Sequence, residues 1–213
     1  MTGRRAASGH ALFLVAIVGI VVGMAMPPES SPASGESADV TMACPSGPCP
    51  CLVLDNSVGA DLASLAQESW GQFLAVFGAR CGCFREVRLV ASRTLASRAA
   101  YFPESATASV RVPATRAMLQ SALVHEWAHH IEFQCMSHQQ LRPAFLAAQR
   151  LAPDTPWRAD SSSGLAASDL AQTPTEQYAE AVVYLVLGGR AIPTKSHVTL
   201  AAVEAVAEWA AGK

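Results

Sequence analysis

The residues of this chain best suited to chemistry lie in segment 123–130, Leu-Val-His-Glu-Trp-Ala-His-His. His125 and His129 are four residues apart, so a helix places both imidazoles on one face, where they can bind one zinc ion. Glu126 lies beside them and can take a proton from a water that the metal activates for attack on a carbonyl group. The motif therefore predicts a hydrolytic zinc (Zn²⁺) site with Glu126 as its general base.

The alternative is that both histidines are ordinary core or surface residues. Apolar side chains at helical spacing surround the motif and predict a helix from about Thr115 to Cys135: Met118, Leu119, Ala122, Leu123 and Ile131. Two polar rings in such a mostly buried helix have no obvious structural purpose. This context favours metal binding.

A catalytic zinc needs a third protein ligand. One candidate is Cys135, ten residues after His125, but a helix needs a glycine turn to bring that position back to the metal. Glu132 stands where the glycine would be. We therefore expect Cys135 to form a disulfide.

The other two candidates are Glu176 and Glu180, which are four residues apart in a later helix. On one helix face, Glu176 can bind the metal while Glu180 orients a metal-binding imidazole from behind. Two alternatives stay open: Glu180 is itself the ligand, or Glu176 only completes a capping box that begins at Thr173.

Together, these residues resemble the gluzincin metallopeptidases, particularly the small minigluzincins of the lethal-factor-like clan. The resemblance covers about residues 58–190 and implies that Glu176 is the third zinc ligand and Glu180 supports a zinc histidine. It also implies an α+β zincin-like fold, mostly helical, with a small β-sheet packed on the active-site helix. The positions that carry it lie in the motifs His125-Glu126-x-x-His129 and Glu176-x-x-Ala179-Glu180.

The N-terminus has the pattern of an export signal. Arg4 and Arg5 precede an uncharged apolar run over 11–26. This run is shorter than the about 20 residues that cross a bilayer comfortably, which favours a signal peptide over residues 1–26, with an uncleaved membrane anchor as the alternative. Residues 27–43, rich in Pro and Ser, are expected to form a flexible linker.

Cysteine usage agrees with export. The chain has six cysteines, an even number suited to three disulfides in an oxidising compartment, and all follow the leader: Cys44, Cys49, Cys51, Cys81, Cys83 and Cys135. Their pairing is open, although residues two apart pair poorly with each other. The alternative is a structural metal site built from the cysteines between 44 and 83.

Residues 44–213 are expected to form a single disulfide-containing catalytic domain. Strands are predicted over 84–91 and 106–112, helices over 58–79, 139–151, 174–187 and 199–211, and a long functional loop over 152–172. The strand 106–112 is expected to align an extended peptide substrate. His130 is expected to face solvent or make a local hydrogen bond, and His138 to lie in a loop.

These observations predict a secreted or extracytoplasmic zinc metallopeptidase that acts on a peptide or protein. If the leader is not cleaved, it would attach the enzyme to the membrane. The formal net charge of −2 gives no basic face for nucleic acid. Two other functions stay open: a catalytically inactive zinc-binding surface or interaction domain, and an exported domain in which zinc only stabilises the fold. Candidates for stabilising the oxyanion are Tyr101, Tyr178, Tyr184, Arg158 and His197.

Overall fold

The computed structural model describes residues 41–44, 49–159 and 171–213. The expected leader over 1–26, the linker up to residue 40 and residues 160–170 of the expected loop lie outside the described residues. The described residues belong to one compact unit. None of their helices has the length and hydropathy that a membrane span requires.

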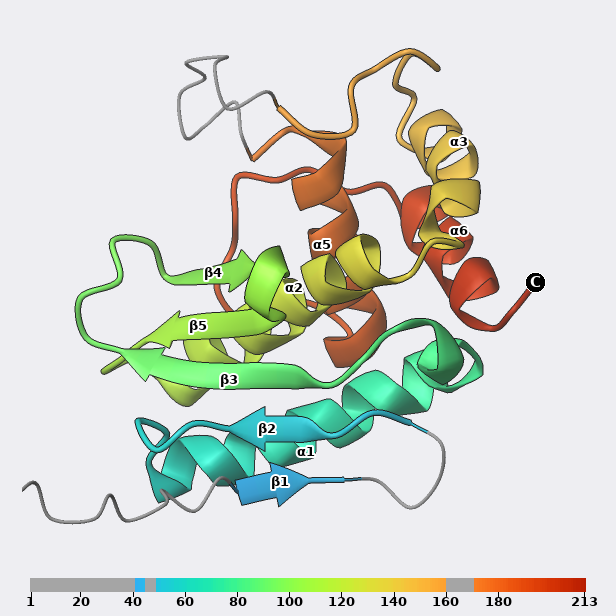
Figure 1. Ribbon diagram of the computed structural model, residues 1–213. Coiled ribbons are helices and arrows are strands. Elements are labelled where there is room, and N and C mark those ends of the chain that lie inside the picture. The colour runs from blue at the N-terminus through green and yellow to red at the C-terminus, as the bar shows by residue number, and fades with distance from the viewer. Residues whose placement is uncertain (1–40, 45–48, 160–170) are drawn as a thin grey trace, which may run out of the picture. The chain divides into compact units, whose positions relative to one another are not determined.

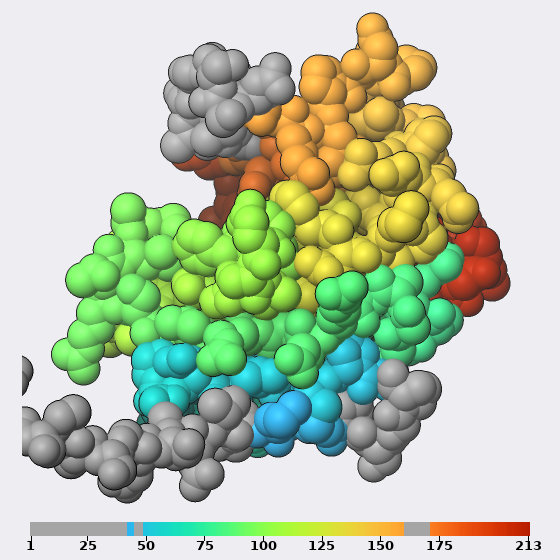
Figure 2. Space-filling model, in the orientation of Figure 1, coloured from blue at the N-terminus to red at the C-terminus, as the bar shows by residue number. Residues whose placement is uncertain are grey.

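A five-stranded mixed sheet forms one layer, with the strand order β1-β2-β3-β5-β4 (Figure 1). The inner strands β2 (Leu52–Leu54), β3 (Val87–Ser92) and β5 (Thr107–Arg111) are parallel to one another. The outer strands β1 (Thr41–Ala43) and β4 (Ala99–Phe102) pair antiparallel with β2 and β5. In Figure 2, β2 (cyan) lies directly against β3 (green).

Two of these strands, β3 and β5, were predicted from the sequence; the other three were not. The last three residues of the expected linker form β1. The prediction that the strand over 106–112 aligns a substrate is wrong, because β5 is covered on both edges by β3 and β4. The edge strand nearest the metal-binding motif is instead β4.

Five α-helices occur in the described residues, and they confirm the predicted helices to within three residues at each end. Their bounds are Ala60–Phe77 (α1), Arg116–Gln134 (α2), His138–Ala148 (α3), Pro174–Leu187 (α5) and Leu200–Ala210 (α6). Helix α2 contacts β4, β5, α1 and α5, whereas α3 packs on α6. The structure therefore has a mixed helix and sheet architecture, with the small sheet packed on the helix that carries the motif (Figure 1).

The rear of α2 is fixed by an aromatic core. Trp127 is fully buried, and its ring lies 5.0 Å from that of Trp70 and 5.8 Å from that of Phe73, both on α1. Burying a large apolar side chain contributes roughly 1.5–3 kcal/mol, so this contact holds α2 firmly in the core. The histidines of the motif thereby receive a rigid support.

All six cysteines are paired, which confirms three disulfides and leaves no thiolate for a cysteine metal site. The pairs are Cys44–Cys51, Cys49–Cys81 and Cys83–Cys135. The second joins the N-terminal segment to the 3₁₀ helix η1 (Gly78–Cys83), and the third joins η1 to the end of α2. Three disulfides are typical of an extracellular or otherwise oxidising environment.

Candidate metal centre

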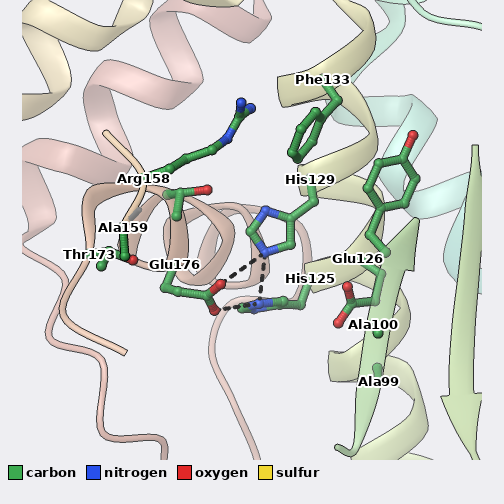
Figure 3. A pocket seen from close by; sticks show the side chains of 12 residues that line it. Ala99, Ala100, His125, Glu126, His129, Phe133, Arg158, Ala159, Thr173 and Glu176 are labelled. Atoms are coloured by element: carbon green, nitrogen blue, oxygen red, sulfur yellow. Dashed lines mark hydrogen bonds and ion pairs between the residues drawn. The ribbon is translucent and has the colours of Figure 1, made fainter. Parts of the chain in front are cut away.

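Three predicted ligand side chains converge between α2 and α5 (Figure 3). The Nε2 atoms of His125 and His129 are 3.2 Å apart. From α5, the Glu176 carboxylate places Oε2 3.1 Å from Nε2 of His125 and Oε1 3.5 Å from Nε2 of His129. All three residues can offer one atom to a shared metal ion.

The donor atoms fit a metal ion in spacing and in chemistry. Neighbouring ligands of a tetrahedral zinc, each about 2.0–2.2 Å from the ion, are roughly 3.3 Å apart, close to the separations observed here. Nδ1 of each histidine faces a carboxylate oxygen, an arrangement that keeps the hydrogen of a neutral ring on Nδ1. The two Nε2 lone pairs then point at each other, and a cation between them would remove their repulsion.

A carboxylate stands behind each histidine. Oε1 of Glu180 lies 2.9 Å from Nδ1 of His125, which is the supporting position predicted for Glu180. Arg190 donates to both oxygens of Glu180 from Nε at 2.6 Å and Nη2 at 2.5 Å. Behind the other histidine, Oε2 of Glu132 lies 3.1 Å from Nδ1 of His129. Such partners fix ring orientation and strengthen a histidine as a ligand.

Glu132 is the residue of this site that sequence reasoning missed. Its fully buried side chain also accepts hydrogen bonds from Trp157 Nε1 (2.9 Å), Arg158 Nε (2.7 Å) and the Thr175 hydroxyl (2.6 Å). Burial raises its pKa, but these contacts and His129 outweigh that effect and lower the pKa to about 2. Its spacing of three from His129 on one helix was the available signal.

In the absence of a metal, the ligands hold a proton. Burial lowers the pKa of His129, but Glu132 and Glu176 outweigh burial and raise that pKa to about 10. The pKa of Glu176 is held low for the same reason: its contacts with the two histidines outweigh the effect of burial. A metal ion bound here must displace a proton, so metal affinity is expected to fall as the pH falls.

Glu126 lies beside the ligands rather than among them. Figure 3 shows its carboxylate on the β4 side of the ligand group, next to Ala99 and Ala100. The residue is 6% exposed, burial raises its pKa, and its carboxylate has no hydrogen-bond partner within the described part of the chain. A carboxylate of raised pKa that is free of partners is suited to accept a proton from a water.

Two cavities meet at the candidate metal centre, and both are lined by His125, Glu126 and Glu176. The first, about 390 Å³ in volume, extends past Tyr101 and Phe133. The second, about 510 Å³, extends on past residues 190–196. The edge strand β4 borders both cavities through Ala99, so a chain lying along β4 would pass the ligands with its two ends in different cavities.

His130 is not solvent-exposed, and its contacts are not local, contrary to the prediction. It is fully buried, with Nδ1 2.9 Å from the Tyr101 hydroxyl and Nε2 2.9 Å from the Arg85 carbonyl oxygen. A carbonyl only accepts, so Nε2 carries the hydrogen; burial lowers the His130 pKa to about 4, which keeps the ring neutral. Nδ1 therefore accepts the hydroxyl hydrogen of Tyr101, which is not available to an oxyanion.

Among the other oxyanion candidates, only Arg158 lines the first cavity. Its guanidinium is paired with Glu132 behind His129, away from the three donor atoms. Tyr178 is fully buried, and Tyr184 is 47% exposed outside both cavities. His197 lines neither cavity, so none of the five predicted candidates is aimed at the three donor atoms.

Two further expectations concerned the ends of helices. Cys135 pairs with Cys83, as predicted, and is not a metal ligand. His138 does not lie in a loop, because it begins α3, fully buried among the rings of Trp157, Tyr178 and Trp209. Tertiary packing decided its position, which the local sequence does not reveal.

Comparison with known proteins adds no relative: no family model, curated protein or solved structure matches this chain.

Proposed function

We propose that this chain is a secreted zinc metallopeptidase of gluzincin type. The observation that carries the proposal is the complete arrangement around one point: three convergent donor atoms, a buried carboxylate behind each histidine, and Glu126 without a partner beside them. When bound, zinc supplies a Lewis acid that polarises a carbonyl group and makes a water more acidic. His125, His129 and Glu176 would hold it.

Glu126 acts as the general base and then as the general acid. Its carboxylate accepts a proton from the attacking water and later delivers that proton to the leaving amine. Burial supports both steps, because it raises the pKa of Glu126 towards the range where a carboxyl group can both gain and lose a proton. Glu132 and Glu180 keep the two imidazoles in place meanwhile.

The surroundings of the centre favour an extended peptide as the substrate. The edge strand β4 can add a peptide backbone by strand pairing, and Ala99 and Ala100 bring this strand to the cavity wall beside Glu126. Because a cavity lies on each side of the ligands, residues on both sides of the cleaved bond can be bound. This supports cleavage within a chain, as an endopeptidase does.

The alternative functions lack comparable support. A purely structural zinc is held by four protein ligands, whereas the metal-binding group found in the described residues has three. A catalytically inactive zinc-binding domain has no use for a buried carboxylate beside the ligands, and the burial of Glu126 without a partner costs stability. Both points favour the enzyme.

The decisive experiment compares the wild type with Glu126→Gln. Zinc content is measured by atomic spectroscopy, and cleavage of a diverse peptide library by mass spectrometry. We expect one zinc in both proteins and a loss of cleavage of at least about 10²- to 10⁴-fold in the variant. Glu204→Gln, on the exposed surface of α6, is the matched control and should cleave like the wild type. Retained cleavage by Glu126→Gln, or a wild type that binds no zinc, would refute the proposal.

A further inference from the structure

The second cavity is bordered by three basic side chains. Arg98 immediately precedes β4, whereas Arg190 and Lys195 lie in the segment between α5 and α6. Their backbone positions are fixed across the cavity: the Arg98 carbonyl accepts from the Arg111 amide at 2.8 Å, and the Lys195 carbonyl accepts from the Gln172 side chain. The three side chains therefore come from two anchored segments that face one space.

The acidic residues of this cavity already have roles. Glu180 is paired with Arg190, whose side chain is 7% exposed, so these two charges neutralise each other. Glu176 faces the two histidines, and Glu126 is the proposed base. The remaining cations, Arg98 and Lys195, have no acidic partner among the residues that the structure describes. The unpaired charges of this cavity are thus the two cations and the Glu126 carboxylate, which leaves a net positive charge.

The first cavity differs in kind. It presents the rings of Tyr101 and Phe133, and its one arginine, Arg158, is paired with buried Glu132 and stacks on Phe133 with its guanidinium carbon 3.7 Å from the ring centre. The two sides of the centre thus offer an aromatic wall and an unpaired cationic wall. A peptide that spans both would contact aromatic rings at one end and unpaired positive charges at the other.

We infer that the second cavity is a specificity subsite for an acidic side chain of the substrate, with Arg98 and Lys195 as its recognising residues. This inference rests on the proposed function. Arg98 is half-buried, so solvent screens its attraction for a neighbouring carboxylate less than it would on an open surface. Lys195 is exposed and adds an attraction that salt weakens.

Binding can be tested without turnover. Fluorescent peptides that end in a zinc-binding hydroxamate, with Asp or Asn at each of the three positions next to that group, are titrated against the zinc-loaded full chain. In low salt we expect the best Asp peptide to bind about tenfold more tightly than its Asn counterpart, as two partly exposed charge pairs would allow. The preference should shrink in high salt.

Charge reversal supplies the variant. Arg98→Glu/Lys195→Glu should lose the Asp preference, with its zinc content unchanged. The matched control is Arg93→Glu/Lys213→Glu, which makes the same charge change at an exposed arginine of the β3–β4 connection and at the C-terminal residue. It should keep the preference. An equal affinity for Asp and Asn peptides in the wild type, or a preference that survives reversal of Arg98 and Lys195, would overturn the subsite.

The same proteins are also given the diverse peptide library. Cleavage without an Asp preference would refute the subsite and leave the peptidase standing. An Asp preference in binding without any cleavage would refute the peptidase and leave the subsite standing. Failure of the zinc-loaded protein to bind any hydroxamate peptide would refute both.

Discussion

Nδ1 of His129 lies 3.1 Å from Oε2 of Glu132, one turn further along α2. This contact makes one half of the candidate metal centre local to a single helix, since the ligand and its supporting carboxylate are three residues apart. The other half is not local, because Glu180 reaches His125 from α5.

Glu132→Gln keeps the shape of the side chain and removes its charge. We expect zinc affinity to fall by about 10- to 100-fold, because His129 loses the carboxylate that orients it. Thermal stability should fall as well, since Arg158 loses its ion pair with the buried side chain of residue 132. Competition with a chelating dye measures the affinity. An unchanged zinc affinity would show that Glu132 serves the fold alone.

Glu176→Ala and Glu180→Ala separate the ligand from its support. Removing the ligand Glu176 should reduce zinc content to background after dialysis, whereas removing Glu180 should weaken affinity by about 10- to 100-fold and leave measurable zinc. Metal analysis of both variants decides between them. If Glu180→Ala loses its zinc and Glu176→Ala retains it, the two roles are reversed.

The disulfides should differ in their contribution to stability. Cys83 and Cys135 are separated by 52 residues, and Cys44 and Cys51 by 7. Chain entropy predicts that replacing the first pair by serines costs about 4 kcal/mol in the free energy of unfolding, against about 2.5 kcal/mol for the second. Urea unfolding of the two double variants tests the order. A larger loss on removal of the short loop would contradict it.

His138 should make the protein sensitive to acid. Burial lowers its pKa to about 3, and neither ring nitrogen has a hydrogen-bond partner among the described residues. Between pH 3 and 6.5 the unfolded chain binds this proton and the folded chain does not, so stability falls by about 1.4 kcal/mol per unit as the pH drops below 6.5.

His138→Phe should remove this part of the pH dependence. Unfolding free energies of the wild type and the variant, measured between pH 6.5 and 5, should diverge by about 2 kcal/mol, with the variant the less sensitive. Replacing the exposed His197 by Gln should give a curve parallel to that of the wild type. Parallel curves for His138→Phe would mean that His138 does not titrate in this way.

The sequence predicted the elements that carry strong local signals. Helix α5 has the predicted bounds because Pro174 starts it and Gly188, at φ 73°, ends it. The strands β1, β2 and β4 have only three or four residues, too few to show an alternation. The edge position of β4 follows from pairing across the sheet, which local periodicity does not encode.

The residues of the candidate site were likewise predicted only in part. The spacing of four within each motif predicted which side chains share a helix face, and the structure brings His125, His129 and Glu176 together. Glu132 was missed because a side chain three residues from a ligand can point to solvent or inward, depending on tertiary packing. Arg98 lies far in the sequence from Arg190 and Lys195, so only the fold shows them as neighbours.

The three disulfides all end at or before Cys135, so no disulfide ties the last third of the chain to the rest. A metal ion shared by His125 and Glu176 would bridge that gap, because its ligands come from α2 and α5, 51 residues apart. Such an ion is a reversible cross-link where cystines provide none. Its removal by a chelator would loosen the C-terminal helices first and open them to attack by other proteases.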